Sequence, residues 1–264
     1  MPLSEKKPII RWTCGAVSFL GLQCLRLAIE NAQKIWGDLV DYVVTYNEWT
    51  RIPSVLRGLD VTFMDVTQEL AKWYDISDMS GDLKKSGWLF SPLQIDSGRR
   101  QLTMDNDVVL VGTCEKIEDF LFGDDQFCLF LEFGKSGNKD AFNQAAHLVP
   151  EHIMKCDGGL LGIPDVCGLS DLVFEVARKN GFTPDFLRQT SWGWEQGVLS
   201  LFCNAVKDRE VIKAERLPRP SFIVERDLTE YLDDKVGLHL SGVNQLYHGW
   251  KVKKFEWYKR QLTI

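Results

Sequence analysis

Two carboxylates separated by one residue, Asp105 and Asp107, follow an apolar segment in the run Leu102-Thr103-Met104-Asp105-Asn106-Asp107-Val108-Val109. Carboxylate oxygens are ligands that suit Mg²⁺ and Mn²⁺, and both ions share their coordination shell readily with phosphates. Because open α/β sheets bind ligands beyond the carboxyl ends of their strands, a strand ending here would place both side chains at such an edge. Asp and Asn are also ordinary turn residues, so the motif alone leaves a metal site and a plain turn as equal alternatives.

The elements around this motif are expected to alternate between helices and strands. Apolar residues recur at three- and four-residue spacing from Val17 to Ile35, which predicts a helix ended by Gly37-Asp38. The other expected strands are 39–46, 61–66, 102–105, 108–111 and 160–163, and the other expected helices are 116–122, 170–179 and 195–206. Ser170 is the expected N-cap of its helix. This order predicts an α/β fold with a mostly parallel mixed sheet and helices on both faces.

Composition restricts the class of protein. The chain has 264 residues, of which 45% are hydrophobic and 26% charged, and its net charge is −6. These fractions are typical of a globular protein with a full core, and we expect a single domain over residues 1–264. The acidic balance argues against nucleic-acid binding. The seven cysteines are scattered and never spaced C-x-x-C, which predicts reduced thiols rather than zinc.

Targeting signals are not evident in the sequence. No apolar run approaches the roughly 20 residues that span a bilayer, and the N-terminus lacks the apolar segment of a signal peptide. We therefore expect a cytoplasmic protein. The tail at 250–264 mixes basic and aromatic residues, which suits peripheral contact with a membrane. The alternative is a terminal element that packs its aromatic side on the core.

Four patches occur in a fixed order between residues 84 and 247. They are Lys84-Lys85-Ser86-Gly87-Trp88 with 105–111 and Ile117-Glu118-Asp119-Phe120-Leu121, then Asp157-Gly158-Gly159-Leu160, then Glu195-Gln196-Gly197-Val198-Leu199, and finally His239-Leu240-Ser241-Gly242. Together they resemble the metal-dependent glycosyltransferases of the glycogenin and bacterial lipooligosaccharide galactosyltransferase type. The resemblance implies a GT-A-like fold.

The same resemblance implies a reaction. A sugar would pass from a nucleotide-diphosphate donor, expected to be a UDP-sugar, to a hydroxyl of a glycan, glycolipid or other acceptor. The implied cofactor is Mn²⁺ or Mg²⁺, held by Asp105, Asp107 and His239, and the imidazole would favour Mn²⁺. An ion that bridges the two phosphates stabilises the negative charge that builds on the leaving group. For His239 the structural alternative is a hydrogen-bonded residue at a strand end.

Further site residues follow from the resemblance, each with a structural alternative. The candidate catalytic carboxylates are Glu195 and Asp157, which would bind sugar hydroxyls, and Glu195 would act as a base if the reaction inverts. The expected donor-binding residues are Thr13, Cys14, Gly15, Ala16, Lys84, Asn106, Ser241 and Gly242. The expected sugar-binding residues are Gly158, Gly159, Gln196 and Trp194. Their alternatives are a plain βα turn at 13–16, a solvated lysine pair at Lys84, a hairpin glycine at Gly242 and core packing of Trp194.

The sequence also departs from the family pattern. Asp157 stands where the family has Asn, Glu195 where it has Asp, and Gln245 where it has a phosphate-contacting Lys that a Pro-Trp pair follows. These departures fit the broad GT-A superfamily better than this one family.

Two other functions remain as alternatives. An Asp-x-Asp followed by two apolar residues also resembles haloacid-dehalogenase-type phosphatases, in which the first Asp is a nucleophile. In that family the motif lies on the first strand, whereas more than a hundred residues precede Asp105, and Asp124-Asp125 comes too soon for the later acidic pair. The second alternative is a protein that binds sugar nucleotides without turnover.

Overall fold

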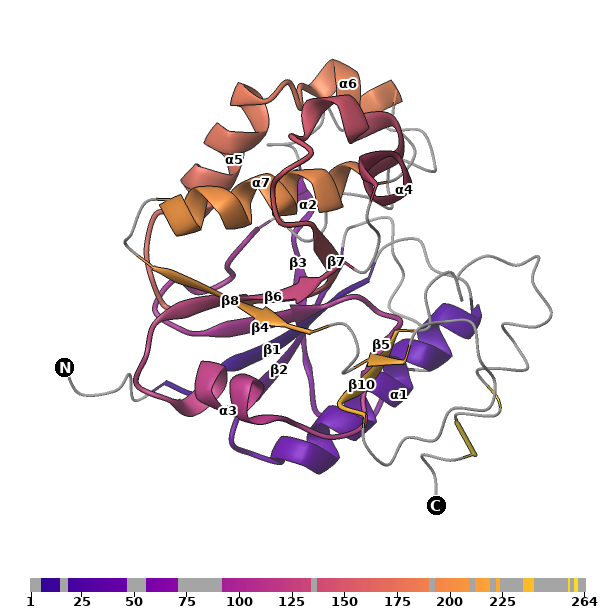
Figure 1. Cartoon of the computed structure of the whole chain (residues 1–264). Coiled ribbons are helices and arrows are strands. Elements are labelled where there is room, and N and C mark those ends of the chain that lie inside the picture. Colours follow the sequence, from indigo (N-terminus) through magenta and orange to yellow (C-terminus); the bar gives the residue numbers. More distant parts are fainter. Residues whose placement is uncertain are drawn as a thin grey trace.

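The large sheet of the computed structural model has seven strands. They are β1 (Ile9–Cys14), β2 (Asp41–Tyr46), β3 (Thr62–Asp65), β4 (Gln101–Met104), β6 (Phe127–Glu132), β7 (Cys156–Ile163) and β8 (Lys213–Leu217). Their order in space is β3-β2-β1-β4-β7-β6-β8, as Figure 1 shows. β7 runs antiparallel to β4 and β6, and the other neighbouring pairs are parallel. The predicted mostly parallel mixed sheet is therefore confirmed.

The structure describes residues 6–14, 19–46, 56–70, 92–133, 137–189, 193–208, 212–218, 222–223, 235–239, 256 and 259–260. Most of the C-terminal tail at 250–264 lies outside them, so the membrane prediction made for it is not tested.

A second, small sheet is attached beside the carboxyl edge of the large one. Its strands are β5 (Val108–Leu110), β10 (Gly237–His239) and β9 (Phe222–Ile223), in the order β5-β10-β9. β5 follows β4 after three residues, so the chain leaves the large sheet there and enters the small one. This transfer brings the end of the chain next to its middle.

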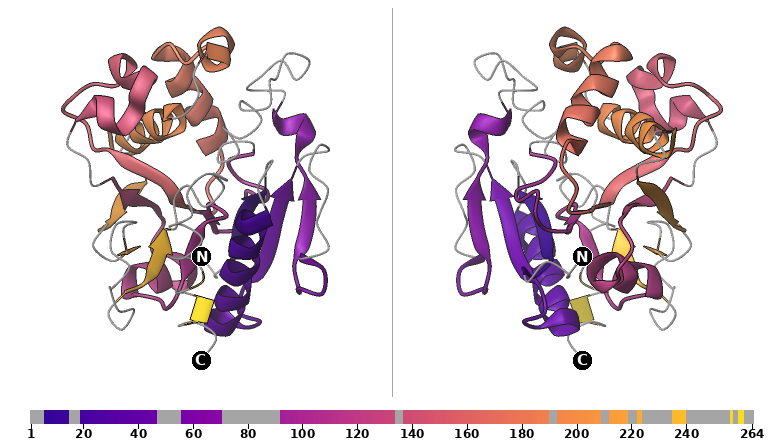
Figure 2. Two further views of the ribbon diagram at one scale, coloured as in Figure 1. Left: turned by 90° about the vertical axis from the view of Figure 1, so that its right-hand side faces the viewer. Right: turned by 90° about the vertical axis from the view of Figure 1, so that its left-hand side faces the viewer.

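Helices cover both faces of the large sheet, as predicted. α1 (Phe19–Trp36) and α3 (Glu115–Phe122) lie on one face, joined where Trp36 Nε1 donates to Glu118 Oε1 at 3.0 Å. The opposite face carries α5 (Leu169–Lys179), α6 (Pro184–Gln189), α7 (Trp194–Asp208), α4 (Asn138–Phe142) and the 3₁₀ turn η5 (Asn143–Leu148). Figures 1 and 2 show the two groups of helices separated by the sheet. A short helix, α2 (Thr67–Leu70), follows β3.

The hydrophobic core is divided by the sheet into two clusters. One joins α1 and α3 to buried sheet residues such as Trp12 and Leu129, and the other joins α5 and α7 to residues such as Phe130 and Leu161. Phe130 and Leu129 are neighbours on β6 that face opposite ways, as the two-residue period of a strand requires. None of the described helices is both long enough and apolar enough to cross a lipid bilayer.

One predicted helix start is wrong. α5 begins at Leu169, and its N-cap is Gly168 rather than Ser170. Gly168 has φ of 87°, in the left-handed region that residues with a Cβ avoid, so the backbone conformation places the glycine at the cap. Ser170 lies inside the first turn of the helix.

Candidate metal centre and active site

The turn between β4 and β5 carries Asp105 and Asp107. The backbone N–H of Asp105 donates to the carbonyl of Gly159 at 3.1 Å, which extends the pairing of β4 with β7 by one residue. The N–H of Val108 then donates back to the carbonyl of Asp105 at 3.1 Å. Asn and Asp favour such turns because their short side chains can hydrogen-bond to nearby backbone. The turn therefore fixes both carboxylates at the carboxyl edge of β4.

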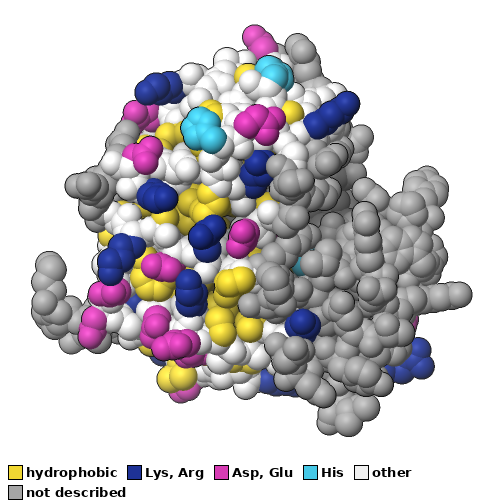
Figure 3. Space-filling model, in the orientation of Figure 1, with side chains coloured by type: hydrophobic (Ala, Val, Ile, Leu, Met, Phe, Trp, Pro, Cys, Tyr) yellow, Lys and Arg dark blue, Asp and Glu magenta, His cyan; other side chains and the backbone are white. Residues whose placement is uncertain are grey.

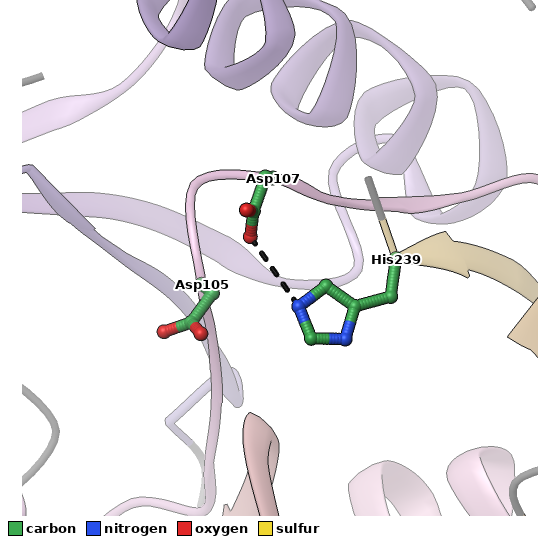
Figure 4. Close-up of side chains that lie close together, drawn as sticks. All are labelled: Asp105, Asp107 and His239. Carbon is green, nitrogen blue, oxygen red and sulfur yellow. Dashed lines mark ion pairs between the residues drawn. The ribbon is translucent and has the colours of Figure 1, made fainter. Parts of the chain in front are cut away.

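The small sheet brings His239 to the same edge. β10 pairs antiparallel with β5, and His239 lies opposite Val108, the residue directly after Asp107. His239 Nε2 lies 3.6 Å from Asp107 Oδ1, and Asp105 projects toward the same space (Figure 4). One ligand atom from each of the three residues lies within 4.8 Å of the others.

This donor set fits a divalent ion such as Mn²⁺ or Mg²⁺. Two carboxylates and one imidazole are hard or intermediate ligands, and the nitrogen suits Mn²⁺ better than Mg²⁺. Two atoms that bind one ion at about 2.1 Å lie at most about 4.2 Å apart. Small side-chain rotations are enough to bring ligand atoms within 4.8 Å of one another to that spacing.

Strand β7 supports the imidazole from its other side. Asp157 Oδ1 lies 4.0 Å from His239 Nδ1 and accepts the backbone N–H of Gly159 at 2.9 Å. A Cβ on Gly159 would lie 3.1 Å from His239 Cε1 and 3.3 Å from its Nδ1, closer than ordinary van der Waals contact. Gly159 thus allows the ring to pack against β7, with a carboxylate beside each ring nitrogen.

Several carboxylates lie close together at this edge and are largely shielded from water. Burial raises the pKa of Asp105 well above its ordinary value, and the charge of Asp107 raises it further. The nearby His239 lowers the pKa of Asp105, whereas the charges of Asp157 and Glu195 raise it. Like charges held together with little water are stabilised by a cation among them, so the electrostatics agree with the donor set.

The first turn of α7 adds a carboxylate and an amide to the site. A Cβ on Gly158 of β7 would lie 4.0 Å from Glu195 Cγ, so the helix start and β7 are neighbours. Burial raises the pKa of Glu195, hydrogen bonds from the backbone at Glu195 and Gly193 lower it, and the charge of Asp157 raises it. Glu195 Oε2 and Gln196 Oε1 are buried and make no hydrogen bond to any described residue.

Other predicted site residues have different surroundings. Asn106 is buried in the turn between the two aspartates, and Thr13 and Cys14 end β1. The Cys14 side chain belongs to the cluster under α1, where burial raises the pKa of its thiol to about 12. The Trp194 side chain is 0% exposed and belongs to the hydrophobic cluster that joins α5 and α7 to the sheet. This burial favours core packing over a sugar-binding surface. The predicted residues outside the described ranges are Gly15, Ala16, Lys84, Ser241 and Gly242.

Sequence reasoning missed one residue close to the candidate metal ligands. Cys24 of α1 is 0% exposed, and burial followed by the negative charge of Asp107 raises the pKa of its thiol well above its ordinary value. The available signal was the helical period of α1, which turns Cys24 toward the sheet along with Leu25 and Ala28. α1 thus covers the site from the side opposite α7.

No protein-family model matches the chain, and no curated protein matches it in sequence. Its structure is similar to that of galactosyltransferase LgtC in complex with donor and acceptor sugar analogues, with a TM-score of 0.56 at 14% identity over 97% of this chain and 96% of that one. The fold is that of the GT-A glycosyltransferases. An active-site variant of LgtC is similar to this chain at a TM-score of 0.51, with 12% identity over 96% and 95% of the two chains. The apo form of mouse xyloside xylosyltransferase 1 gives 0.50, with 13% identity over 91% and 99%.

The GT-A fold bears on the phosphatase alternative. In the phosphatase family the motif lies on the first strand. Here Asp105 follows β4, which is the fourth strand along the chain and also the fourth across the sheet when β3 is counted first. The three similar structures named above are of glycosyltransferases. The position of Asp105 after β4 therefore does not fit the phosphatase alternative.

Proposed function

We propose that this protein is a glycosyltransferase that transfers a sugar from a nucleotide-diphosphate donor, expected to be a UDP-sugar, to an acceptor hydroxyl. The observation that carries the proposal is the convergence of Asp105, Asp107 and His239 at the carboxyl edge of a GT-A sheet. The similar LgtC structure holds donor and acceptor sugar analogues, which supports the same two classes of partner here.

Asp105, Asp107 and His239 would hold Mn²⁺ or Mg²⁺. When bound, such an ion stabilises the charge on the departing diphosphate, an effect worth several kcal/mol. Asp157, beside Nδ1 of His239, would keep the imidazole oriented with Nε2 toward the site, as carboxylates behind histidine ligands do. Gly159 contributes by leaving room for this packing.

Glu195 and Gln196 would bind hydroxyl groups of the transferred sugar. Each has a buried oxygen without a hydrogen-bond donor among the described residues, and an unpaired buried acceptor costs about 1–3 kcal/mol. A sugar hydroxyl supplies the missing donor. Because both residues lie in the first turn of α7, they would approach the sugar from one side, and Gly158 opposite them leaves space for the ring.

The remaining predicted contacts belong to the same proposal. Thr13 to Ala16 would face the nucleoside at the end of β1, and Lys84, Ser241 and Gly242 would approach the diphosphate. The chain would act as one domain.

The decisive experiment is an assay of nucleoside diphosphate release from a panel of UDP-, GDP- and dTDP-sugars. We expect release from a UDP-sugar with Mn²⁺ present, loss of release with EDTA, and loss in an Asp107→Asn variant that remains folded. Metal-dependent nucleotide binding without release from any donor would favour a binding protein. If the protein neither binds a nucleotide nor releases nucleoside diphosphate from any donor, the proposal is refuted.

A further inference from the structure

Two buried cysteines, Cys156 and Cys203, lie where the start of β7 meets the second half of α7. Both belong to the hydrophobic cluster on that face of the sheet, and both are free thiols. Cys156 directly precedes Asp157, the carboxylate beside His239. None of the roles proposed above uses either thiol, although one of them adjoins the candidate site.

Two hydrogen bonds hold the segment around Cys156 against the part of α7 that carries Cys203. The backbone N–H of Cys156 donates to Ser200 Oγ at 2.9 Å. Asn204 Nδ2 donates to the carbonyl of Met154 at 3.4 Å. Cys203 lies between these two helix residues and follows Ser200 by three positions, which is almost one helical turn. Residues at this spacing share a face of a helix, so Cys203 lies on the side of α7 that packs on β7.

The two thiols also interact with each other. Burial raises the pKa of the Cys156 thiol well above its ordinary value, and a side-chain hydrogen bond with Cys203 and the charge of Cys203 raise it further. A hydrogen bond raises the pKa of an acid when the acid donates it, so the S–H of Cys156 is directed toward the Cys203 sulfur.

Cys128 of β6 is the other buried thiol of this cluster. Burial raises its pKa, and the charge of Cys203 raises it further, so Cys128 is also near α7. It lies too far from Cys156, because Cys156 is opposite Glu132, and four residues of strand separate Glu132 from Cys128 by about 13 Å. A disulfide requires Cα atoms within about 7 Å of each other. The two hydrogen bonds between α7 and the start of β7 favour Cys156 as the partner of Cys203.

A groove of about 680 Å³ gives small molecules access to Cys203. Its lining includes Cys203 together with Met154 and Lys155, the two residues before Cys156. Figure 3 shows this face of the molecule, where lysine and arginine side chains surround exposed apolar atoms. Cys203 is 1% exposed, whereas Cys156 is 0% exposed. An oxidant little larger than water, such as hydrogen peroxide, therefore meets the sulfur of Cys203 first.

We propose that Cys156 and Cys203 are a site of oxidative modification, at which hydrogen peroxide forms a disulfide between β7 and α7. The Cys203 sulfur attacks one oxygen of the peroxide, which gives a sulfenic acid and releases water. The Cys156 sulfur then attacks the Cys203 sulfur, the S–S bond forms, and the hydroxyl leaves with the Cys156 proton as a second water. Two thiols lose two electrons in total, and one peroxide is reduced to two waters.

This disulfide weakens the candidate metal centre, a consequence that rests on the proposed function. A covalent S–S bond of about 2.05 Å is shorter than any non-bonded contact between two sulfurs, so β7 and α7 have to shift. Asp157 follows Cys156 directly, and its Oδ1 lies 4.0 Å from Nδ1 of His239. Loss of a carboxylate that orients a histidine ligand weakens metal binding by about 10–100-fold.

Peptide mapping of the full chain by mass spectrometry tests the modification. The protein is treated with hydrogen peroxide in the presence of EDTA, so that no metal ion catalyses other oxidation. We expect one disulfide, between the peptides that contain Cys156 and Cys203, and its reversal by dithiothreitol. Free thiols at both positions after treatment, a disulfide between Cys203 and Cys128, or disulfides only at exposed cysteines such as Cys167 would overturn the proposal.

Calorimetric titration with MnCl₂, after peroxide and EDTA have been removed, tests the consequence. We expect oxidation to weaken Mn²⁺ binding by the wild type about tenfold, and reduction to restore it. Cys203→Ser should bind Mn²⁺ equally well before and after treatment. Cys167→Ser, the control at an exposed cysteine, should respond to peroxide as the wild type does. A mapped disulfide that leaves Mn²⁺ binding unchanged would overturn the proposed effect on the metal centre.

The two measurements separate a failure of this proposal from a failure of the proposed function. If the reduced wild type binds no Mn²⁺, the metal centre of the proposed function is refuted, and the mapping alone decides the modification. The mapping uses the wild type, so it is decisive even where Cys203→Ser is unstable. Equal weakening of Mn²⁺ binding in Cys203→Ser and the wild type would assign the effect to oxidation elsewhere and overturn the proposal.

Discussion

The contact between Gly159 and His239 shows how a residue without a side chain shapes the candidate metal centre. Adding one methyl group at Gly159 would place it 3.1 Å from the imidazole Cε1 and 3.3 Å from Asp157 Oδ1. The ring is also confined by Asp107 at its other nitrogen, so it has to move as a whole. The arrangement of the candidate metal ligands therefore depends on a position that offers no ligand.

We predict that Gly159→Ala weakens Mn²⁺ binding at least tenfold, because the displaced imidazole no longer completes the donor set. Calorimetric titration with MnCl₂ measures the change. Gly158→Ala is the matched control, since a Cβ there would meet nothing closer than Glu195 Cγ at 4.0 Å. Equal losses in both variants would point to general damage to β7 rather than to displacement of His239.

Asp105 and Asp107 can be tested without disturbing the turn that holds them. Asn forms the same turns as Asp, so Asp105→Asn and Asp107→Asn keep the backbone while removing a charge each. We predict that either change abolishes Mn²⁺-dependent UDP binding and leaves the far-ultraviolet circular dichroism spectrum unchanged. Calorimetry that finds wild-type affinity for UDP and Mn²⁺ in either variant would remove that residue from the metal site.

Glu195 links the site to the pH dependence of stability. Burial raises its pKa in the folded protein above its ordinary value of 4.5. At a pH below 4.5, Glu195 is protonated in both the folded and the unfolded protein, so folding does not bury a charge. As the pH rises through the raised pKa, the folded state has to accommodate a buried carboxylate, and stability falls.

We therefore predict that Glu195→Gln is more stable than the wild type at pH about 7 and that this difference disappears near pH 4. Urea unfolding over that pH range measures it. The control is Glu115→Gln, because Glu115 also lies in the first turn of a helix, α3, but is exposed. A wild type that is as stable as Glu195→Gln at neutral pH would contradict the assigned burial of this carboxylate.

At the scale of elements, one serine joins β7 to α7. Ser200 is 0% exposed, and its Oγ accepts the backbone N–H of Cys156 at 2.9 Å and donates to the carbonyl of Gln196 at 2.7 Å. The first contact adjoins Asp157, and the second adjoins Glu195. This bridge sets the distance between the two elements that carry those carboxylates.

We predict that Ser200→Ala lowers the free energy of unfolding by about 1–3 kcal/mol, because the buried N–H of Cys156 loses its acceptor. Urea denaturation measures the loss. Ser170→Ala in α5 serves as the control, since the Ser170 hydroxyl has no hydrogen-bond partner among the described residues. Of the two changes, only Ser200→Ala should lower the free energy of unfolding. Equal losses in both variants would contradict the assigned role of the Ser200 bridge.

The elements that the sequence predicts well are those with a strong local pattern. α1 shows its period over 18 residues, and β2 is rich in β-branched and aromatic residues. β8 was missed because Lys-Ala-Glu-Arg-Leu has no strand pattern, and only its pairing with β6 at the sheet edge makes it a strand. β6 was missed for another reason, because its apolar run is typical of either a buried strand or a buried helix.

The candidate site was predictable in part for related reasons. Asp105 and Asp107 are two residues apart, so local spacing reveals them, and the ordered resemblance pointed to His239. The packing of Asp157 and Gly159 against His239 depends on the pairing of β4 with β7 and of β5 with β10. Such long-range pairings leave no signal in local spacing.

At the scale of the whole molecule, the site consists of segments that lie far apart in the chain. Residues 105–107, 157–159, 195–196 and 239 come from the β4–β5 turn, β7, α7 and β10. The two hydrophobic clusters on either side of the sheet hold these elements in place. The unfolded chain therefore has no comparable site, and ligands of the site should bind the folded state alone.

This exclusive binding leads to a prediction for the whole molecule. A ligand that binds only the folded state at about 100 times its dissociation constant stabilises it by about 2.7 kcal/mol. We expect UDP together with Mn²⁺ to raise the free energy of unfolding by about this amount, because the buried carboxylates gain a cation and the cation gains phosphate ligands. UDP alone should have a much smaller effect, since Asp105, Asp107 and Asp157 repel its phosphates. Urea unfolding with UDP, with Mn²⁺, with both, and with both plus EDTA separates these terms. The Asp105→Asn variant should lose the joint stabilisation, and a joint effect that survives this change would place the nucleotide elsewhere on the fold.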